Sequence, residues 1–185
     1  MCCLFGIVDY QNNLTPRQLN RITAVLSRAC EARGTDATGI SYNLYDKLKI
    51  YKKPVAAHNM KYQIPFGVHT IMGHTRMTTQ GDEKQNYNNH PFYGSVSNTD
   101  FALAHNGVLH NDTILRAIEE LPETKIETDS YIAVQLIEKM KTLDTDSLKY
   151  MAEQLEGSFT ITVLDEKDNL YFVKGDNPMC IYHFK

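Results

Sequence analysis

The amino terminus of the chain carries residues suited to nucleophilic chemistry. The sequence opens MCCLFGIVDY, so removal of Met1 would leave the thiol of Cys2 beside a free α-amine. Such an amine titrates near pH ~8 and can take the thiol proton within the same residue, so no separate catalytic histidine is required. The small side chain of Cys2 is of the kind that allows an aminopeptidase to remove Met1. The alternative is a structural pair of buried thiols, because free cysteine behaves as a small hydrophobe.

Several polar groups elsewhere could complete such a site. Arg76 offers a planar guanidinium that suits a carboxylate, or it forms a structural ion pair. Asn106 and Gly107 offer a side-chain amide and a backbone N–H to a single oxyanion, or they form a tight turn. Asp129 could bind an ammonium, or either it or Thr128 caps the following helix. The segments RGTDATG at 33–39, HTRMTTQG at 74–81 and HNG at 105–107 each end a predicted strand or helix and begin a polar turn, so they can converge at one edge of the fold.

A metal centre built on His74, His90, His105 and Asp129 is the remaining chemical alternative. No two of these residues have ligand spacing on one element, which disfavours a metal site. We therefore predict neither a metal nor another cofactor.

Hydrophobic patterns predict the elements that would position these residues. A strand is expected over 2–9, followed by a helix with a capping box of Thr15 and Gln18 that stops near Gly34. Further strands are expected over 38–44, 48–54, 69–75, 101–109, 158–165 and 169–175, and helices over 111–120, 129–141 and 145–156. The strand over 101–109 is expected to end in a polar turn at its Asn-Gly pair. A long polar loop should occupy 78–100.

Composition narrows the function class. The 185 residues suit one domain, and the formal charge of −3 offers no basic surface for nucleic acid. The sequence has no segment of spanning length and no signal-peptide pattern, so we expect no membrane association and a cytoplasmic location. The cysteines at 2, 3, 30 and 180 form no CxxC pair, which agrees with a reducing compartment. Cys30 and Cys180 are predicted to be ordinary core thiols.

Six ordered blocks together carry a resemblance that none carries alone. The blocks are CCLFG, RGTDATG, HTRMTTQG, NNHPF, AHNGVL and ETDSY. From residue 2 to about 135 they closely resemble the glutaminase domain of class II glutamine amidotransferases, the N-terminal-nucleophile type. The resemblance implies an α+β fold, a four-layer αββα sandwich of two antiparallel sheets between helical layers. It also makes 1–185 a single amidotransferase domain.

The resemblance also implies roles for individual residues. Cys2 would attack the side-chain amide carbon of glutamine, with the Asn106 side chain and the Gly107 amide as oxyanion hole. The substrate ligands would be Arg76 for the α-carboxylate, Asp129 for the α-ammonium and Thr79 as a further contact. The implied product is glutamate, with ammonia released to a synthase partner.

The sequence departs from the family pattern in three places. Cys3 stands where many members have glycine, and it either packs inward or forms a second reactive thiol. Met77, Thr78, Thr79 and Gln80 replace the usual Trp-Ala-Thr-His, which leaves the roles of Met77 and Gln80 open. No synthase domain is present, so the chain is either a minimal glutaminase or one shortened at its C-terminal end.

Three functions remain open from the sequence. The leading one is a stand-alone glutaminase that hydrolyses glutamine. A second is a hydrolase of another γ-glutamyl amide, since such substrates present the same amino-acid end to Arg76 and Asp129. A third is a non-catalytic glutamine-binding regulatory module, which a retained Met1 would favour because it covers the amine.

Overall fold

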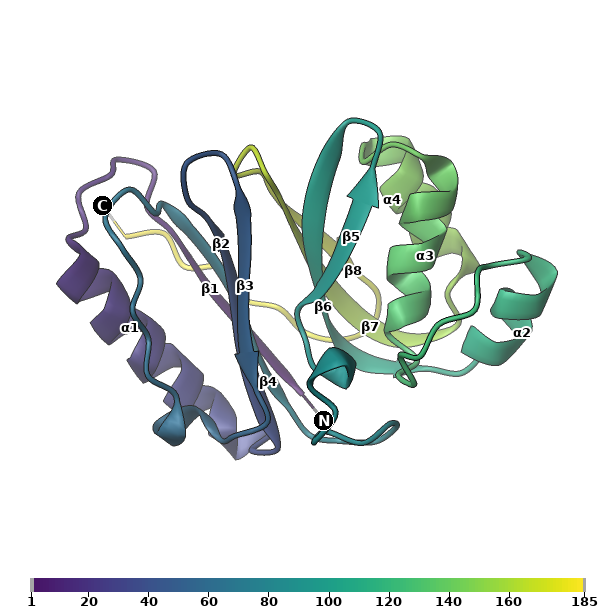
Figure 1. The fold of residues 1–185 in the computed structure, drawn as a ribbon, viewed down its shortest axis with the longest axis horizontal. Helices are drawn as coiled ribbons and strands as arrows, with labels where there is room; N and C mark the ends of the chain where they lie inside the picture. Colours follow the sequence, from purple (N-terminus) through teal and green to yellow (C-terminus); the bar gives the residue numbers. More distant parts are fainter. Residues whose placement is uncertain (1, 185) are drawn as a thin grey trace.

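A computed structural model describes residues 2–184, which form four layers (Figure 1). The elements in chain order are β1 (Cys3–Val8), α1 (Pro16–Ala29), the 3₁₀ helix η1 (Cys30–Ala32), β2 (Ala37–Asn43), β3 (Leu48–Lys53), η2 (Ala57–Asn59), β4 (Thr70–Arg76), η3 (Asn86–Asn88), β5 (Phe92–Val96), β6 (Thr99–Leu109), α2 (Asp112–Ile118), α3 (Tyr131–Met140), α4 (Thr145–Gln154), β7 (Gly157–Asp165) and β8 (Leu170–Lys174).

Two four-stranded antiparallel sheets form the inner layers. Their strand orders are β1-β4-β2-β3 and β5-β6-β7-β8. Helix α1 covers the outer face of the first sheet, and α2, α3 and α4 cover the outer face of the second (Figure 1). The predicted four-layer sandwich is therefore confirmed.

The core has three parts, one for each interface between layers. Leu19, Ile40 and Ile71 pack between α1 and the first sheet. The cluster between the second sheet and its helices includes Phe101, Ile132, Leu136, Met151 and Ile161. Between the two sheets, Met72 and Leu164 meet the alanines at 102 and 104. Small side chains at this inner interface allow the sheets to approach closely, which brings their ends together at one site.

The start of α1 agrees with the predicted capping box. The Thr15 hydroxyl accepts from the Gln18 N–H at 3.3 Å, and the Gln18 side chain accepts from the Thr15 N–H at 2.9 Å. The helix ends at Ala29, earlier than predicted. Gly34 serves a close approach instead, since a Cβ there would lie 2.4 Å from the carbonyl carbon of Arg76.

Two local predictions were wrong in the central region. Residues 92–96 form β5 and pair with β6, so the irregular polar segment ends before Phe92 instead of reaching 100. Strand β6 also continues through Asn106 and Gly107 to Leu109 instead of turning there. Pairing with β7 explains the continuation, because Asn106 lies opposite Thr160 and Gly107 opposite Phe159.

Buried histidines between the sheets make the stability of this fold depend on pH. Burial lowers the pKa of His74 to about 3 and lowers that of His90 well below its usual value. The two rings lie 4.1 Å apart between centroids. Below pH ~6.5 the His74 side chain binds a proton in the unfolded chain but stays neutral in the folded protein. The free energy of unfolding therefore falls as the pH falls toward about 3.

We expect the free energy of unfolding to fall by about 2 kcal/mol for His74 alone between about pH 7 and about pH 5. Denaturant titrations at the two pH values measure this difference. Replacing the exposed His110 with glutamine serves as a control and should leave the difference unchanged. Equal unfolding free energies at the two pH values would contradict burial of neutral histidines.

Candidate active site

Cys2 and Arg76 lie at the same end of the first sheet because β1 and β4 are antiparallel neighbours. Cys3 pairs with Thr75, so Cys2 precedes one strand where Arg76 ends the other. The guanidinium of Arg33 donates through Nε to the Cys2 carbonyl at 3.0 Å and holds its backbone. The predicted loss of Met1 concerns a residue outside the described range.

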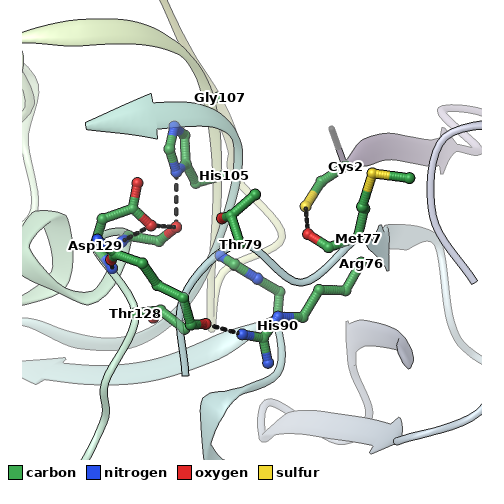
Figure 2. A pocket seen from close by; sticks show the side chains of 11 residues that line it. Cys2, Arg76, Met77, Thr79, His90, His105, Gly107, Thr128 and Asp129 are labelled. Carbon is green, nitrogen blue, oxygen red and sulfur yellow. Dashed lines mark hydrogen bonds between the residues drawn. The ribbon is translucent and has the colours of Figure 1, made fainter. Parts of the chain in front are cut away.

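A small pocket lies where this end meets the second sheet (Figure 2). Figure 2 shows Cys2 and Met77 on one side and His105 and Asp129 on the other, with Arg76 between them. The lining residues are Cys2, Arg76, Met77, Thr79, Gln80, His90, His105, Gly107, Thr128, Asp129 and Ser130. The pocket volume is about 20 Å³, which is room for roughly one water molecule. In this structure the pocket is therefore too small to hold a molecule much larger than water.

The Cys2 side chain points into this pocket. Its Sγ lies 3.6 Å from the Met77 carbonyl oxygen, to which the thiol donates (Figure 2). Burial raises the pKa of Cys2, while the hydrogen bond to Met77 and the charge of Arg76 lower it. The net effect favours the neutral thiol, so the sulfur needs a base before it can act as a nucleophile.

Arg76 is a buried cation without a carboxylate partner in the described part of the chain. Only 3% of the residue is exposed. Nη1 donates to the Asn89 side-chain oxygen at 2.7 Å, and Nη2 donates to the Gln80 carbonyl. The structural ion pair that was the alternative interpretation is absent among residues 2–184. Because its side-chain hydrogen bonds go to neutral oxygens and no carboxylate contacts it directly, the guanidinium is suited to receive an anion.

Asp129 places a buried carboxylate on the opposite side of the pocket. One oxygen accepts from the Leu109 N–H at 2.8 Å, and the other accepts from the Ser130 N–H at 2.9 Å. Helix α3 begins at Tyr131 with Ser130 as its N-cap residue and has no side-chain cap. The carboxylate thus does not cap this helix; its hydrogen bonds tie the start of α3 to β6 and fix the charge beside the pocket.

The structure brings five of the six predicted site residues to one pocket and leaves Asn106 just outside its lining. Thr79 and Gly107 both line the pocket. Side chains alternate along β6, so the Asn106 side chain lies on the opposite face of the strand from that of His105, on the face where Ala102 and Ala104 pack against the first sheet. Its carbonyl accepts from the Asn177 side chain at 2.7 Å. Its Oδ1 is buried and has no hydrogen-bond partner among residues 2–184.

Gln80 is one of two lining residues, with Met77, whose roles the sequence left open. Its backbone carbonyl accepts from Arg76, and its side-chain oxygen accepts from the Asp129 N–H at 2.9 Å. One residue therefore connects the buried cation to the buried carboxylate. The HTRMTTQG block indicated that Gln80 lies near the pocket. Its role was not predicted because Gln80 stands where the family pattern has histidine.

The RGTDATG block supports the pocket from behind. The Asp36 N–H donates to the Arg76 carbonyl at 3.0 Å, and the Asp36 carboxylate accepts from the Thr78 N–H at 2.7 Å. These bonds hold the chain where it leaves β4 and turns along the pocket. The block therefore positions Arg76 and Thr79 without lining the pocket itself.

No group of three or more His, Cys, Asp or Glu side chains within 2–184 is arranged to hold a metal ion. No helix in the same part of the chain is long and apolar enough to cross a membrane. Cys180, predicted to be a core thiol, is exposed, since the segment after β8 lies at the surface.

Comparison with known proteins matches the chain to one family over most of its length. The model of the family described as glutamine amidotransferases class-II matches residues 1–165. A glutamine–fructose-6-phosphate aminotransferase (isomerizing) of Listeria innocua is 33% identical over an alignment of 161 residues. The alignment covers 82% of this chain and 26% of the relative. The enzyme of the same name from Staphylococcus epidermidis is 29% identical over an alignment of 197 positions, which covers 98% of this chain and 30% of the relative. The chain thus spans less than a third of the length of these relatives.

Solved structures show the same fold. The glutamine phosphoribosylpyrophosphate amidotransferase from B. subtilis, complexed with ADP and GMP, superposes with a TM-score of 0.67 at 22% identity. That match covers 90% of this chain and 35% of the other. A second structure, the allosteric regulatory enzyme of purine biosynthesis, has a TM-score of 0.71 at 22% identity, covering 90% and 36%. At this identity the likeness concerns the fold.

Proposed function

The chain belongs to the class II glutamine amidotransferases, and we propose that it hydrolyses the side-chain amide of glutamine to glutamate and ammonia through a thioester on Cys2. One observation carries this proposal. A buried guanidinium, Arg76, and a buried carboxylate, Asp129, line the same pocket as the Cys2 thiol. An α-amino acid carries the two complementary charges, so Arg76 would hold its carboxylate and Asp129 its ammonium.

The proposed reaction follows acyl transfer. The α-amine freed by loss of Met1 takes the Cys2 proton, and the thiolate attacks the amide carbon. The side chain of Asn106 and the N–H of Gly107 then stabilise the oxyanion. The resulting α-ammonium gives its proton to the departing nitrogen, which leaves as ammonia. The amine next takes a proton from water, and the hydroxide cleaves the thioester to glutamate.

Substrate binding would require this small pocket to widen. Nη2 of Arg76 is occupied by the carbonyls of Gln80 and Gly81, which a substrate carboxylate would replace. The irregular segment that begins at Met77 carries both carbonyls, so we propose that this segment moves away and closes again over bound glutamine. Thr79 lies on the same segment and would contact the substrate on closure.

Mass spectrometry and product assays test the proposal together. Incubation with a diazo-ketone analogue of glutamine should add one adduct to a chain that has lost Met1, mapped to Cys2. Glutamate release should be faster from glutamine than from other γ-glutamyl amides. Faster glutamate release from another γ-glutamyl amide would identify that amide, and not glutamine, as the preferred substrate. A chain that gives neither an adduct nor turnover would favour a regulatory glutamine-binding module.

The fate of the ammonia forms a separate part of the proposal. The matched relatives are named aminotransferases, and this chain spans only a quarter to a third of their length. We propose that residues 1–185 form a single amidotransferase domain whose ammonia passes to a synthase domain or partner chain. A cytoplasmic location remains a prediction from the sequence.

Replacing Arg76 with lysine should mainly weaken glutamine binding. Lysine keeps the charge but loses the planar pair of donors that bind a carboxylate. We expect KM to rise roughly 10- to 100-fold with a smaller change in kcat. Steady-state kinetics measure both constants, with the exposed Arg21→Lys as control. A change confined to kcat would contradict a ground-state contact.

Replacing Asn106 with alanine should mainly lower kcat. Loss of one oxyanion donor is expected to lower kcat roughly 100- to 1000-fold, with KM little changed. Asn59→Ala, an exposed asparagine at the end of η2, provides the matched control. An unchanged kcat would show that Asn106, which the structure places beside the pocket lining, is not an oxyanion donor.

A further inference from the structure

A second pair of thiols lies directly behind the nucleophile. The Sγ atoms of Cys3 and Cys30 are 2.9 Å apart, although the residues are 27 positions apart in sequence. Cys3 comes from β1, and Cys30 begins η1 after helix α1. Both residues are half-buried and carry free thiols. A disulfide bond is about 2.05 Å long, so the sulfurs need to approach by less than about 1 Å to form one.

The backbone holds the two cysteines in this arrangement. Cys3 lies opposite Thr75 in the pairing of β1 with β4. The hydroxyl of the same Thr75 donates to the Cys30 carbonyl at 3.1 Å. Both sulfurs also lie near the carbonyl oxygen of Leu4, at 3.6 Å for Cys3 and 3.9 Å for Cys30. One threonine thus fixes both segments, and the short sulfur–sulfur distance follows from sheet geometry.

The two thiols differ in acidity. The hydrogen bond with Cys30 lowers the pKa of Cys3 to about 7, the charge of Arg33 lowers it further, and burial opposes both. The same hydrogen bond and burial raise the pKa of Cys30. Cys3 is therefore the more acidic thiol of the pair and is partly ionised at neutral pH, whereas Cys30 stays protonated.

We propose that Cys3 and Cys30 form a dithiol site that a hydroperoxide oxidises to a disulfide. The Cys3 thiolate attacks the peroxide oxygen, which breaks the O–O bond and gives a sulfenic acid and hydroxide. The Cys30 sulfur then displaces the sulfenic oxygen, which leaves as water when the Cys30 proton is transferred. The proton that Cys3 released on ionisation neutralises the hydroxide, so two thiols and one hydrogen peroxide become one disulfide and two waters. A thiol reductant restores the pair by exchange.

The site is distinct from the Cys2 chemistry. The Cys2 side chain points toward Met77 and the pocket (Figure 2), whereas Cys3, the next residue, faces the opposite side of the strand. The disulfide would join β1 to the segment that carries Arg33, which holds the Cys2 carbonyl. The inference does not depend on the proposed glutaminase activity.

Disulfide mapping tests the proposal. The full chain is treated with hydrogen peroxide, the remaining thiols are alkylated, and the protein is digested with trypsin without reduction. Cleavage leaves Cys2 and Cys3 in one peptide and Cys30 in another, so the expected product is one linked pair that dithiothreitol separates. Full alkylation of Cys3 and Cys30 after peroxide treatment would overturn the proposal.

Matched variants assign the link within the shared peptide. Cys2→Ala and Cys180→Ser should keep the linked pair, whereas Cys3→Ser and Cys30→Ser should lose it. In Cys30→Ser, the sulfenic acid on Cys3 should persist and react with dimedone, a readout that a merely structural thiol would not provide. A link that survives in Cys3→Ser and disappears in Cys2→Ala would assign the reaction to Cys2 and overturn the proposal.

Discussion

Replacing Cys2 with alanine is expected to reduce kcat for glutamine hydrolysis by roughly 10⁴- to 10⁶-fold, because no thioester can form without the sulfur. The Cys2 thiol makes one long hydrogen bond, 3.6 Å to the Met77 carbonyl, so its loss should change stability little. Glutamine binding should persist, since Arg76 and Asp129 remain. The assay measures glutamate released per enzyme, and calorimetry measures binding.

Cys180→Ala is the matched control for this experiment, because it removes an exposed thiol far from Cys2 in sequence. It should retain the activity of the unmodified chain. Turnover by Cys2→Ala within about tenfold of normal would assign the nucleophile elsewhere. A variant that neither hydrolyses nor binds glutamine, and that unfolds at lower denaturant, would instead support the structural interpretation of the cysteine pair.

Replacing Gly107 with alanine should damage both stability and activity. Gly107 has φ near +153°, and a Cβ there would lie 1.9 Å from the Ser158 carbonyl oxygen and 2.7 Å from the His105 ring. Because Ser158 belongs to β7, the new methyl group would force β6 and β7 apart at the pocket. We expect a loss of roughly 3 kcal/mol or more in the free energy of unfolding.

A second glycine with positive φ provides the control. Gly67 has φ near +92°, and a Cβ there meets nothing within 4 Å. Gly67→Ala should therefore cost only the backbone strain, about 1 to 2 kcal/mol, and should leave glutaminase kinetics unchanged. Denaturant titration of both variants compares the two effects. Equal losses would show that the approach to Ser158 is relieved by local movement and does not constrain β6.

Local signals predicted much of the fold. The start of α1 depends on Thr15 and Gln18, which interact within one turn, and the hairpin of β2 and β3 depends on strands only five residues apart. Strand β5 was missed because it is only five residues long and has a glycine at its centre, which weakens the local strand signal. Its identity as a strand comes from its hairpin with β6, whose connection at Ser97 and Asn98 contains no glycine or proline to mark a turn.

For the site, too, some features could be predicted from the sequence and others depended on the tertiary structure. Residue types and order within the blocks determined the thiol, the guanidinium and the carboxylate, because an acyl-transfer site for an amino acid needs those charges whatever the path of the chain. Tertiary structure decided that Arg76 has neutral partners, that Gln80 connects it to Asp129, and that Asn106 lies beside the lining. It also placed Cys3 against Cys30. These outcomes depend on strand register and side-chain direction, which are set by pairing between segments distant in the chain.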